Sequence, residues 1–521
     1  MKKLYIASLL LLSTLRLSAQ NATWADDIAS ILYNNCTTCH HTGGIAPTSF
    51  IDYVDAMNEA TDIQDAINDG EMPPWPPDPS YRHLAHERVL SGIEKAAIND
   101  WVNNGTPQGN MANAPTPPVY NSNAVITNPD YIYQIPSYTV NTPTDLYRNF
   151  VIPSGLISQL SITDFEVIPG NMAIVHHVIV YEDTSDVPAQ LDLADPGEGY
   201  TNFGGTGSST SNMIGLWVPG MAAFHYPAGL GQKLPAGTDI IIQVHYPGGT
   251  FGETDTTQIR LITSSAALRE VYTLPLLNHS TNMTNGPLFI PANTTATFYE
   301  EQIVPFNVSF ISVGAHMHLL GQSALTYGVT LAMDTIPFLR INHWDFHWQG
   351  LYQFRNVLKV PAGTTLYGEC FYDNTVNNPE NPNSPPQDVS LGESTTDEMM
   401  LFYFSFALYQ AGDENIVIDS AAIVSSIYDP AFADIIHTPQ LYDPAPNPAN
   451  DFVNLSFYLP ATDDVIFTMY DLKGSIVKTS NQNFDAGLNV HRISINDLQS
   501  GEYVLKMTAG GVERTKKIVI E

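Results

Sequence analysis

Apolar positions recur with two different periods along the chain, and the change of period divides it into parts. Between residues 22 and 112 they follow helical spacing, as in WADDIASILYNN and SGIEKAAINDWVNNG. A polar, proline-containing linker, QGNMANAPTPPVYNSN, comes next. From about residue 125 to 435 the pattern changes to short β-branched runs separated by Gly, Pro and Asn, such as DIIIQVHY and VSFISVGAH. This texture predicts β-sandwich structure.

The β-rich part is about twice as long as one sandwich, so we expect two, over residues 125–275 and 276–435. Alternating runs such as VIFTMYDL and EYVLKMTAG predict a further small sandwich over residues 440–521. The predicted fold is therefore multidomain. A small α-helical domain precedes two antiparallel, jelly-roll-like β-sandwiches, and a small β-sandwich ends the chain.

The first 20 residues, MKKLYIASLLLLSTLRLSAQ, have the features of a signal peptide: two lysines, an apolar run and small residues at its end. No other uninterrupted apolar stretch is long enough to span a bilayer, so we expect an exported protein that is not an integral membrane protein. The formal net charge of -33 argues against a nucleic-acid partner. Three cysteines do not provide a disulfide framework.

Cys36-Thr37-Thr38-Cys39-His40 is a C-x-x-C-H motif, the attachment pattern of c-type haem. Two thiols one helical turn apart match the two vinyl groups, and the next residue places an imidazole under the iron. A zinc knuckle or a redox dithiol would be the alternatives. A four-ligand zinc site needs another ligand pair, and the sequence has no second C-x-x-C. The motif therefore favours a covalently bound haem c.

The helical region also resembles small cytochromes c in the segment DGEMPPWPPDP. That family places the sixth iron ligand, a methionine, in a rigid proline-flanked loop downstream of the haem motif. The resemblance implies Met72 as the partner of His40 on the iron. Met57, His41, His83 and His86 remain alternatives.

Five histidines lie in apolar, strand-like segments. His176 and His177 are adjacent in NMAIVHHVIVYED, His245 lies in DIIIQVHY, and His316 and His318 lie in GAHMH. Residues i and i+2 of a strand share a face, so His316 and His318 can bind one metal without distortion, whereas adjacent residues point to opposite faces. A shared role for His176 and His177 therefore requires the strand to end, bulge or twist there. One strand histidine alone is usually structural, but this set predicts a metal site for Cu, Zn, Fe or Ni.

The order HH, H and HxH followed by Asp397-Glu398-Met399 resembles the copper type II, ascorbate-dependent monooxygenases, the peptidylglycine and dopamine hydroxylase family. The resemblance covers about residues 130 to 430, and WDFHWQGLYQF and the tripeptide at 368–370 extend it to bacterial members. It implies two copper sites, and it matches Tyr403 to a family tyrosine. The implied ligands are His176, His177 and His245 for one copper, and His316, His318 and Met399, with Met400 as the alternative to Met399, for the other.

The resemblance implies a secreted copper-dependent monooxygenase (EC 1.14.17-like) that hydroxylates a C–H bond of a small-molecule or peptide-like substrate with O2. Its methionine-containing copper would bind O2, and its all-histidine copper would supply the second electron. Because a c-type haem carries single electrons, we expect it to take electrons from a donor and to replace or supplement ascorbate. A non-catalytic copper and haem electron-transfer protein, or a ligand-binding β-sandwich protein, would be the alternatives.

Three features depart from the family pattern. Gly314 stands where the peptide hydroxylases have a substrate-binding arginine, and Leu401 stands where they have an asparagine. The animal enzymes contain several disulfides, whereas Cys370 is the one cysteine between residues 130 and 430. These departures argue against a peptidylglycine substrate.

The C-terminal segment from Tyr442, with PAPNPAND, LQSGEYVLKM and TKKIVIE, resembles the type IX secretion sorting domain of Bacteroidetes. The resemblance implies the type IX machinery as a partner and a secreted or cell-surface location. An Ig-like accessory domain would be the alternative, and it would leave the protein in the periplasm.

Overall fold

The computed structural model shows two compact units, Met1–Pro73 with Leu90–Tyr120, and Pro74–Val89 with Asn121–Glu521. The predicted signal peptide, residues 1–20, lies outside the described residues. The structure describes residues 21–520 except 45, 121–123, 203, 220, 222, 420–438, 442–443, 445–446, 451, 460–461 and 485–486.

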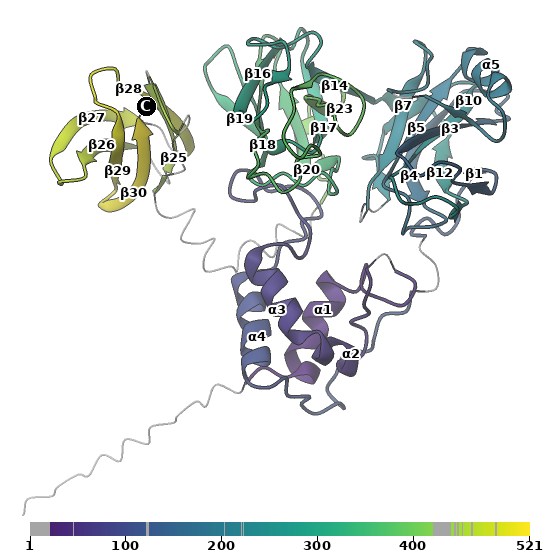
Figure 1. Cartoon of the computed structure of the whole chain (residues 1–521), viewed down its shortest axis with the longest axis horizontal. Helices are drawn as coiled ribbons and strands as arrows, with labels where there is room; N and C mark the ends of the chain where they lie inside the picture. Colours follow the sequence, from purple (N-terminus) through teal and green to yellow (C-terminus); the bar gives the residue numbers. More distant parts are fainter. Residues whose placement is uncertain are drawn as a thin grey trace, which may run out of the picture. The chain divides into compact units, whose positions relative to one another are not determined.

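The first unit is helical (Figure 1). Its core is centred on Trp24 and Trp101, which are both buried and whose ring centroids lie 6.3 Å apart. The last helix begins with a capping box in which Ser91 and Glu94 each bind the other's backbone N–H. The helices are η1 (Trp24–Ile28), α1 (Ala29–Asn35), α2 (Tyr53–Asn58), α3 (Ala60–Asp69) and α4 (Gly92–Asn103).

In the second unit, the first sandwich consists of one sheet in the order β1-β12-β4-β9-β13, with β8 on β4, and another in the order β6-β3-β10-β5-β7. The sheets pack closely, because a Cβ atom on Gly215 of β7 would lie 2.3 Å from the ring of Phe165 on β4. The elements are β1 (Tyr131–Gln134), β2 (Tyr138–Thr139), β3 (Leu146–Pro153), β4 (Leu160–Ile168), β5 (His177–Asp183), α5 (Val187–Ala194), β6 (Tyr200–Thr201), β7 (Asn212–Trp217), β8 (Phe224–His225), β9 (Leu230–Leu234), β10 (Asp239–Tyr246), β11 (Thr254–Asp255), β12 (Gln258–Ser264) and β13 (Arg269–Glu270).

The second sandwich pairs a sheet in the order β14-β23-β17-β20 with one in the order β16-β21-β18-β19. Phe310, Phe338 and Phe404 are fully buried or nearly so in its core. Strand β14 crosses the division expected at residue 275 and pairs with β23, so this sandwich includes residues from Tyr272. The elements are β14 (Tyr272–Asn278), β15 (Phe289–Ile290), β16 (Thr295–Ile303), β17 (Val308–His316), β18 (Gly321–Val329), β19 (Thr335–Ile341), β20 (Tyr352–Val360), β21 (Thr365–Asp373), β22 (Val389–Ser390), β23 (Leu401–Leu408) and η2 (Asp413–Asn415).

Residues 74–89 fall inside the predicted helical domain of 22–112, yet they pack on the second sandwich. Asp78 forms an ion pair with Arg340 at 2.7 Å, and the Ala85 N–H donates to the carbonyl of Gln353 at 2.8 Å. The helical unit is therefore interrupted by a segment that belongs to the second unit.

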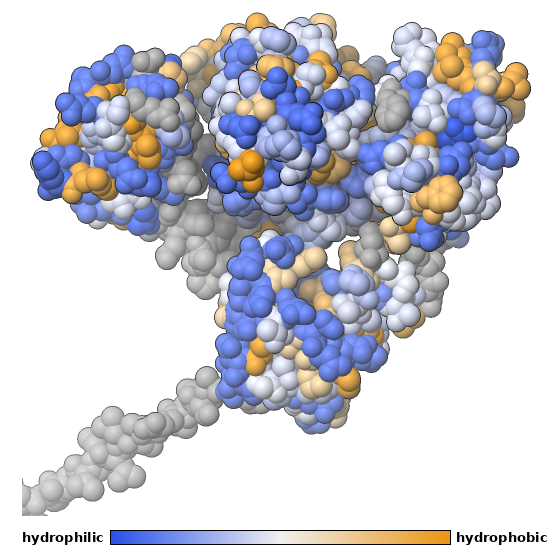
Figure 2. Space-filling view, in the orientation of Figure 1, coloured by the Kyte–Doolittle hydropathy of each residue, from blue (hydrophilic) through white to orange (hydrophobic). Residues whose placement is uncertain are grey.

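The C-terminal module, residues 440–520, contains two sheets in the orders β24-β25-β28 and β27-β26-β29-β30. Phe457, Phe467 and Met507 are buried between them. In Figure 2, which shows the whole chain, hydrophilic residues cover most of the visible face, and apolar residues form small separate patches. No helix among the described residues is long and apolar enough to cross a membrane. The strands are β24 (Gln440–Leu441), β25 (Phe452–Leu459), β26 (Asp463–Asp471), β27 (Ile476–Phe484), β28 (Gly487–Ser494), β29 (Gly501–Ala509) and β30 (Val512–Ile520).

Candidate metal centre

The adjacent histidines lie at the beginning of a strand. Strand β5 starts at His177, and a turn over residues 172–174 precedes it, so His176 lies outside the alternating part of the strand. The His176 N–H donates to the carbonyl of His245 at 3.0 Å, and His177 is the register partner of His245 on β10. The backbone irregularity that a shared site requires is therefore present at this pair.

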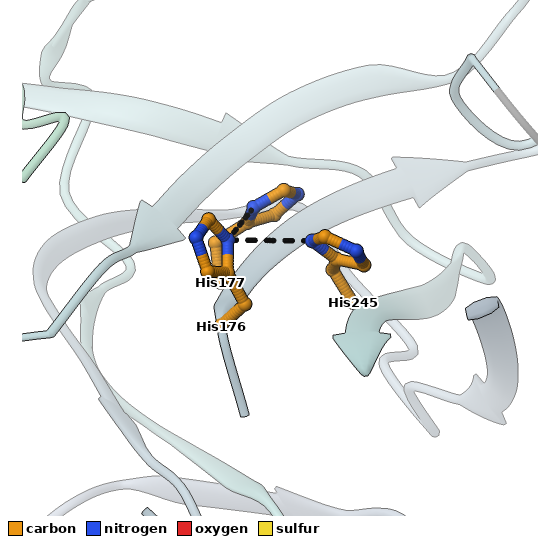
Figure 3. A group of neighbouring side chains, drawn as sticks. All are labelled: His176, His177 and His245. Carbon is orange, nitrogen blue, oxygen red and sulfur yellow. Dashed lines mark hydrogen bonds between the residues drawn. The ribbon is translucent and has the colours of Figure 1, made fainter. Parts of the chain in front are cut away.

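All three imidazoles converge (Figure 3). The Nδ1 atom of His176 lies 3.1 Å from Nδ1 of His177 and 3.3 Å from Nδ1 of His245. Lone pairs that meet in this way repel one another unless a proton or a cation lies between them. Burial, with smaller contributions from the neighbouring imidazoles, lowers the pKa of His176 to about 4 and places the pKa values of His177 and His245 well below the usual range. The rings are therefore neutral at neutral pH, which is the form that binds transition metals.

Two side chains lie beside the ring of His245. Tyr147 stacks on it with ring centroids 4.2 Å apart and an interplanar angle of 7°. A carboxylate oxygen of Asp145 lies 3.9 Å from its Nε2 atom. The same oxygen accepts a hydrogen bond from the Thr395 hydroxyl at 2.6 Å. Asp145 thereby connects the three-histidine cluster with the loop that leads to Met399.

The second pair of histidines lies at the end of β17. The strand ends at His316, and His318 follows just beyond it, with the two ring centroids 5.1 Å apart. His316 Nδ1 contacts the Gln349 Oε1 atom at 2.6 Å, and His318 Nδ1 contacts the Asp397 carbonyl oxygen at 3.0 Å. Because both partners are acceptors, both Nδ1 atoms carry the proton, and each Nε2 atom keeps a lone pair for a metal. Burial lowers the pKa of His316 to about 3 and that of His318 to about 4.

The two candidate methionines differ in their surroundings. Met400 is fully buried in the core of the second sandwich, whereas Met399 lies outside that core cluster and is 9 % exposed. Strand β23 begins at the next residue, Leu401. The packing of Met400 favours Met399 as the metal ligand, although this choice remains a prediction.

Gly314 and Tyr403 are register partners on β17 and β23. Burial raises the pKa of Tyr403 to about 12, so its phenol is protonated at neutral pH. A Cβ atom on Gly314 would lie 2.7 Å from the carbonyl oxygen of Gly350, so an arginine there would require the backbone to move. The structure thus gives a steric reason for the missing arginine.

Sequence patterns did not identify the loop that contacts both histidine sites. Phe346 stacks on His176 at 4.9 Å and meets the His318 ring edge-to-face at 5.9 Å. His347, which no spacing pattern identifies as a ligand, has its ring 5.6 Å from that of His176. The sequence marked this run, WDFHWQGLYQF, as part of the family resemblance but gave none of its residues a role in the site. Gln349, which accepts from His316, belongs to the same run.

In the helical unit, Cys36 caps the C-terminus of α1, and neither Cys36 nor Cys39 forms a disulfide. The His40 N–H donates to the Cys36 carbonyl at 2.9 Å, which brings the motif into one turn. His40 Nδ1 donates to the Thr48 carbonyl at 3.0 Å, and its ring stacks on Phe50 at 4.1 Å. The His40 Nε2 atom is therefore the nitrogen that can bind iron.

The expected sixth ligand, Met72, is 37 % exposed. Of the alternatives, His41 is buried, stacks on Tyr120 at 4.1 Å and contacts the Thr37 carbonyl oxygen through Nδ1. His83 and His86 belong to the second unit. Met72 and Met57 both belong to the helical unit, after the haem motif and before helix α4, and Met72 remains the predicted sixth ligand.

Residues 289–421 match the family model described as copper type II ascorbate-dependent monooxygenase, C-terminal domain. Residues 445–521 match the secretion system C-terminal sorting domain, which indicates export and a cell-surface or secreted location.

Several animal hydroxylases are similar to part of the chain. Tyramine beta-hydroxylase of Caenorhabditis briggsae is 25% identical over 229 residues, covering 40% of this chain and 36% of the relative. Dopamine beta-hydroxylase of Bos taurus is 26% identical over 226 residues, with the same coverage. The Homo sapiens enzyme is 24% identical over 258 residues, covering 46% and 41%. The chain thus spans well under half the length of these relatives, and the similarity supports a copper-dependent oxidoreductase.

Among solved structures, a beta-glucuronidase of Faecalibacterium prausnitzii shares 11% identity, with 43% of this chain and 37% of that chain covered. Its TM-score of 0.13 is too low to support an argument about the fold.

Proposed function

We propose that the protein is a secreted, copper-dependent monooxygenase that hydroxylates a C–H bond with O2 and receives electrons through a c-type haem. The main support is the convergence of three neutral imidazoles on one point, with Nδ1 atoms 3.1 and 3.3 Å apart, in a chain similar to copper hydroxylases. Three imidazole nitrogens suit a copper ion, and no acidic group is part of this cluster.

The residues of the second site fit copper as well. His316 and His318 would bind through Nε2, since their Nδ1 atoms already donate to Gln349 and to the Asp397 carbonyl. Met399 would add a thioether, which favours Cu(I). Copper ions bound at the two sites would supply O2 activation and one-electron chemistry. The protein itself holds the imidazoles neutral, and Phe346 contacts both the His176 ring and the His318 ring.

The helical unit fits a covalent haem c. Cys36 and Cys39 would form the thioethers, and His40, oriented by Thr48 and Phe50, and Met72 would bind the iron. Such a haem would supply one-electron transfer. We propose that a donor reduces it and that it supplements or replaces ascorbate.

The substrate is a small molecule or a peptide-like compound. A Cβ atom on Gly314 would lie 2.7 Å from the Gly350 carbonyl oxygen, so the arginine of the peptide hydroxylases would require the backbone to move. This supports a substrate other than a peptidylglycine. The C-terminal module would direct the protein to the type IX machinery, and deletion of residues 440–521 should therefore retain it in the periplasm.

Copper analysis and isotope labelling test the proposed function. The purified full-length protein, loaded with copper and reduced, should bind about two copper ions per chain and incorporate one atom of labelled O2 into a product from a panel of C–H substrates. Met399→Ala should abolish incorporation while leaving the haem spectrum unchanged. Met400→Leu is the matched control and should retain activity. Copper binding without O2 uptake would indicate an electron-transfer protein instead.

A further inference from the structure

The buried carboxyl group of Glu398 contacts the main chain next to the second histidine pair. Glu398 is 0 % exposed. Its Oε1 atom accepts the Leu320 N–H at 2.7 Å, and its Oε2 atom accepts the N–H groups of His318 at 2.9 Å and Met399 at 3.2 Å. Each of these donors is a main-chain group, so the side chain of Glu398 binds the backbone of both segments that bear the predicted ligands.

His318 and Met399 lie outside the paired strands, whereas His316 is the last residue of β17 and pairs with Leu401. Strand β17 ends at His316 and β18 begins at Gly321, while β23 begins at Leu401. The carboxylate therefore supplies acceptors that a sheet would otherwise provide. Two further contacts support the same backbone: the Asp397 carbonyl accepts from the His318 ring at 3.0 Å, and the Tyr372 hydroxyl donates to the Met399 carbonyl at 2.8 Å.

A carboxyl group is a costly way to fill a core position, because an apolar side chain of similar volume would pack there without desolvating polar atoms. Its advantage is geometric. Hydrogen bonds from several main-chain N–H groups to one side chain fix the spacing of two loops more strictly than apolar contacts do. Metal ligands held within a fraction of an ångström are what a copper site with a weak thioether ligand requires.

We propose that Glu398 is the positioning residue of the second copper site: its carboxylate holds the backbone of His318 and Met399 at the spacing at which imidazole and thioether reach one metal ion. This inference rests on the proposed function, because it requires copper at His316, His318 and Met399. Glu398 itself does not bind the metal, since both of its oxygens face main-chain N–H groups.

The test replaces Glu398 in the full-length protein with Gln, which keeps the volume but turns an N–H donor toward a main-chain N–H. X-ray absorption of the Cu(I)-loaded protein should lose its copper–sulfur component, and the affinity of the second copper should fall about 10–100-fold. The copper at His176, His177 and His245 should stay bound. Glu300→Gln is the matched control: it also removes a fully buried carboxyl group of the second sandwich, but one with no hydrogen-bond partner among the described residues.

An unchanged copper–sulfur signal and an unchanged affinity in Glu398→Gln would overturn the positioning role. If the Gln variant does not fold, Glu398→Asp decides, since a carboxylate one methylene shorter should reach fewer of the N–H groups and weaken the second copper. Wild-type affinity in the Asp variant would contradict the proposal. A wild-type protein that shows no sulfur-bound copper would instead refute the copper site itself, and with it both inferences.

Discussion

Glu300 provides the sharpest prediction about stability. This residue lies on β16 opposite Gly368 of β21, is 0 % exposed, and neither of its carboxyl oxygens has a hydrogen-bond partner among the described residues. Burial raises its pKa to about 8. Its titratable neighbours Cys370 and Tyr372 have pKa values that burial raises well above their usual ranges, so they are neutral and offer no compensating charge.

The sign of the pH effect follows from this pKa. The folded protein keeps the carboxyl proton up to about pH 8, whereas the unfolded chain releases it near pH 4.5. The associated stability is therefore fully present below pH 4.5 and is lost as the pH rises toward 8. At about 1.4 kcal/mol per pH unit over this interval, the loss amounts to about 5 kcal/mol.

Glu300→Gln removes the titration and leaves a neutral amide at every pH. Calorimetry of the second-sandwich transition between pH 4.5 and 8 should show the melting temperature of the wild type falling relative to the variant by about 10–20 °C. Other titrating groups are common to both proteins and cancel in the difference. Parallel melting profiles would show that Glu300 is hydrated or paired, and the reasoning from burial would then be wrong.

Three further outcomes are expected. His177→Ala should lower bound copper from about two ions to about one per chain, measured by metal analysis, because the three-histidine cluster loses one of its nitrogens; full occupancy would contradict that cluster as a copper site. Gly215→Ala should destabilise the first sandwich by about 1–3 kcal/mol in thermal unfolding, since its Cβ would overlap the Phe165 ring. His40→Ala should remove the c-type absorption bands and slow turnover driven by an electron donor, while turnover with ascorbate persists; unchanged donor-driven turnover would exclude the haem as a feeder.

Sequence patterns predicted the parts of the site that depend on local geometry. The spacing of His316 and His318 placed their rings together, although β17 ends at His316 rather than continuing through the pair. Strand alternation also indicated that an irregular backbone is needed at His176 and His177 if both rings face one site, and the start of β5 provides it. These properties follow from a few consecutive residues.

Contacts between distant segments could not be predicted in this way. Phe346 reaches His176 across about 170 residues of chain, and Asp145 reaches Thr395 across 250. Neither partner has a distinctive spacing, because their meeting depends on how the strands and loops of the second unit pack. Glu398 was visible only as part of a family motif, and its three main-chain donors become apparent only when the β17–β18 turn is placed beside it.

The position of His177 at the first residue of β5, directly after His176, has a consequence for folding. His177 faces His245 in the β5–β10 register, and a slip of one residue would move the His177 ring to the opposite face of the sheet. Only a chain that has paired these strands correctly presents three converging nitrogens. A metal ion bound there would thus stabilise the native strand register relative to the register shifted by one residue. It would also oppose fraying at this end of the sheet. Metal binding would then favour correctly folded chains during maturation, in addition to being required for the reaction.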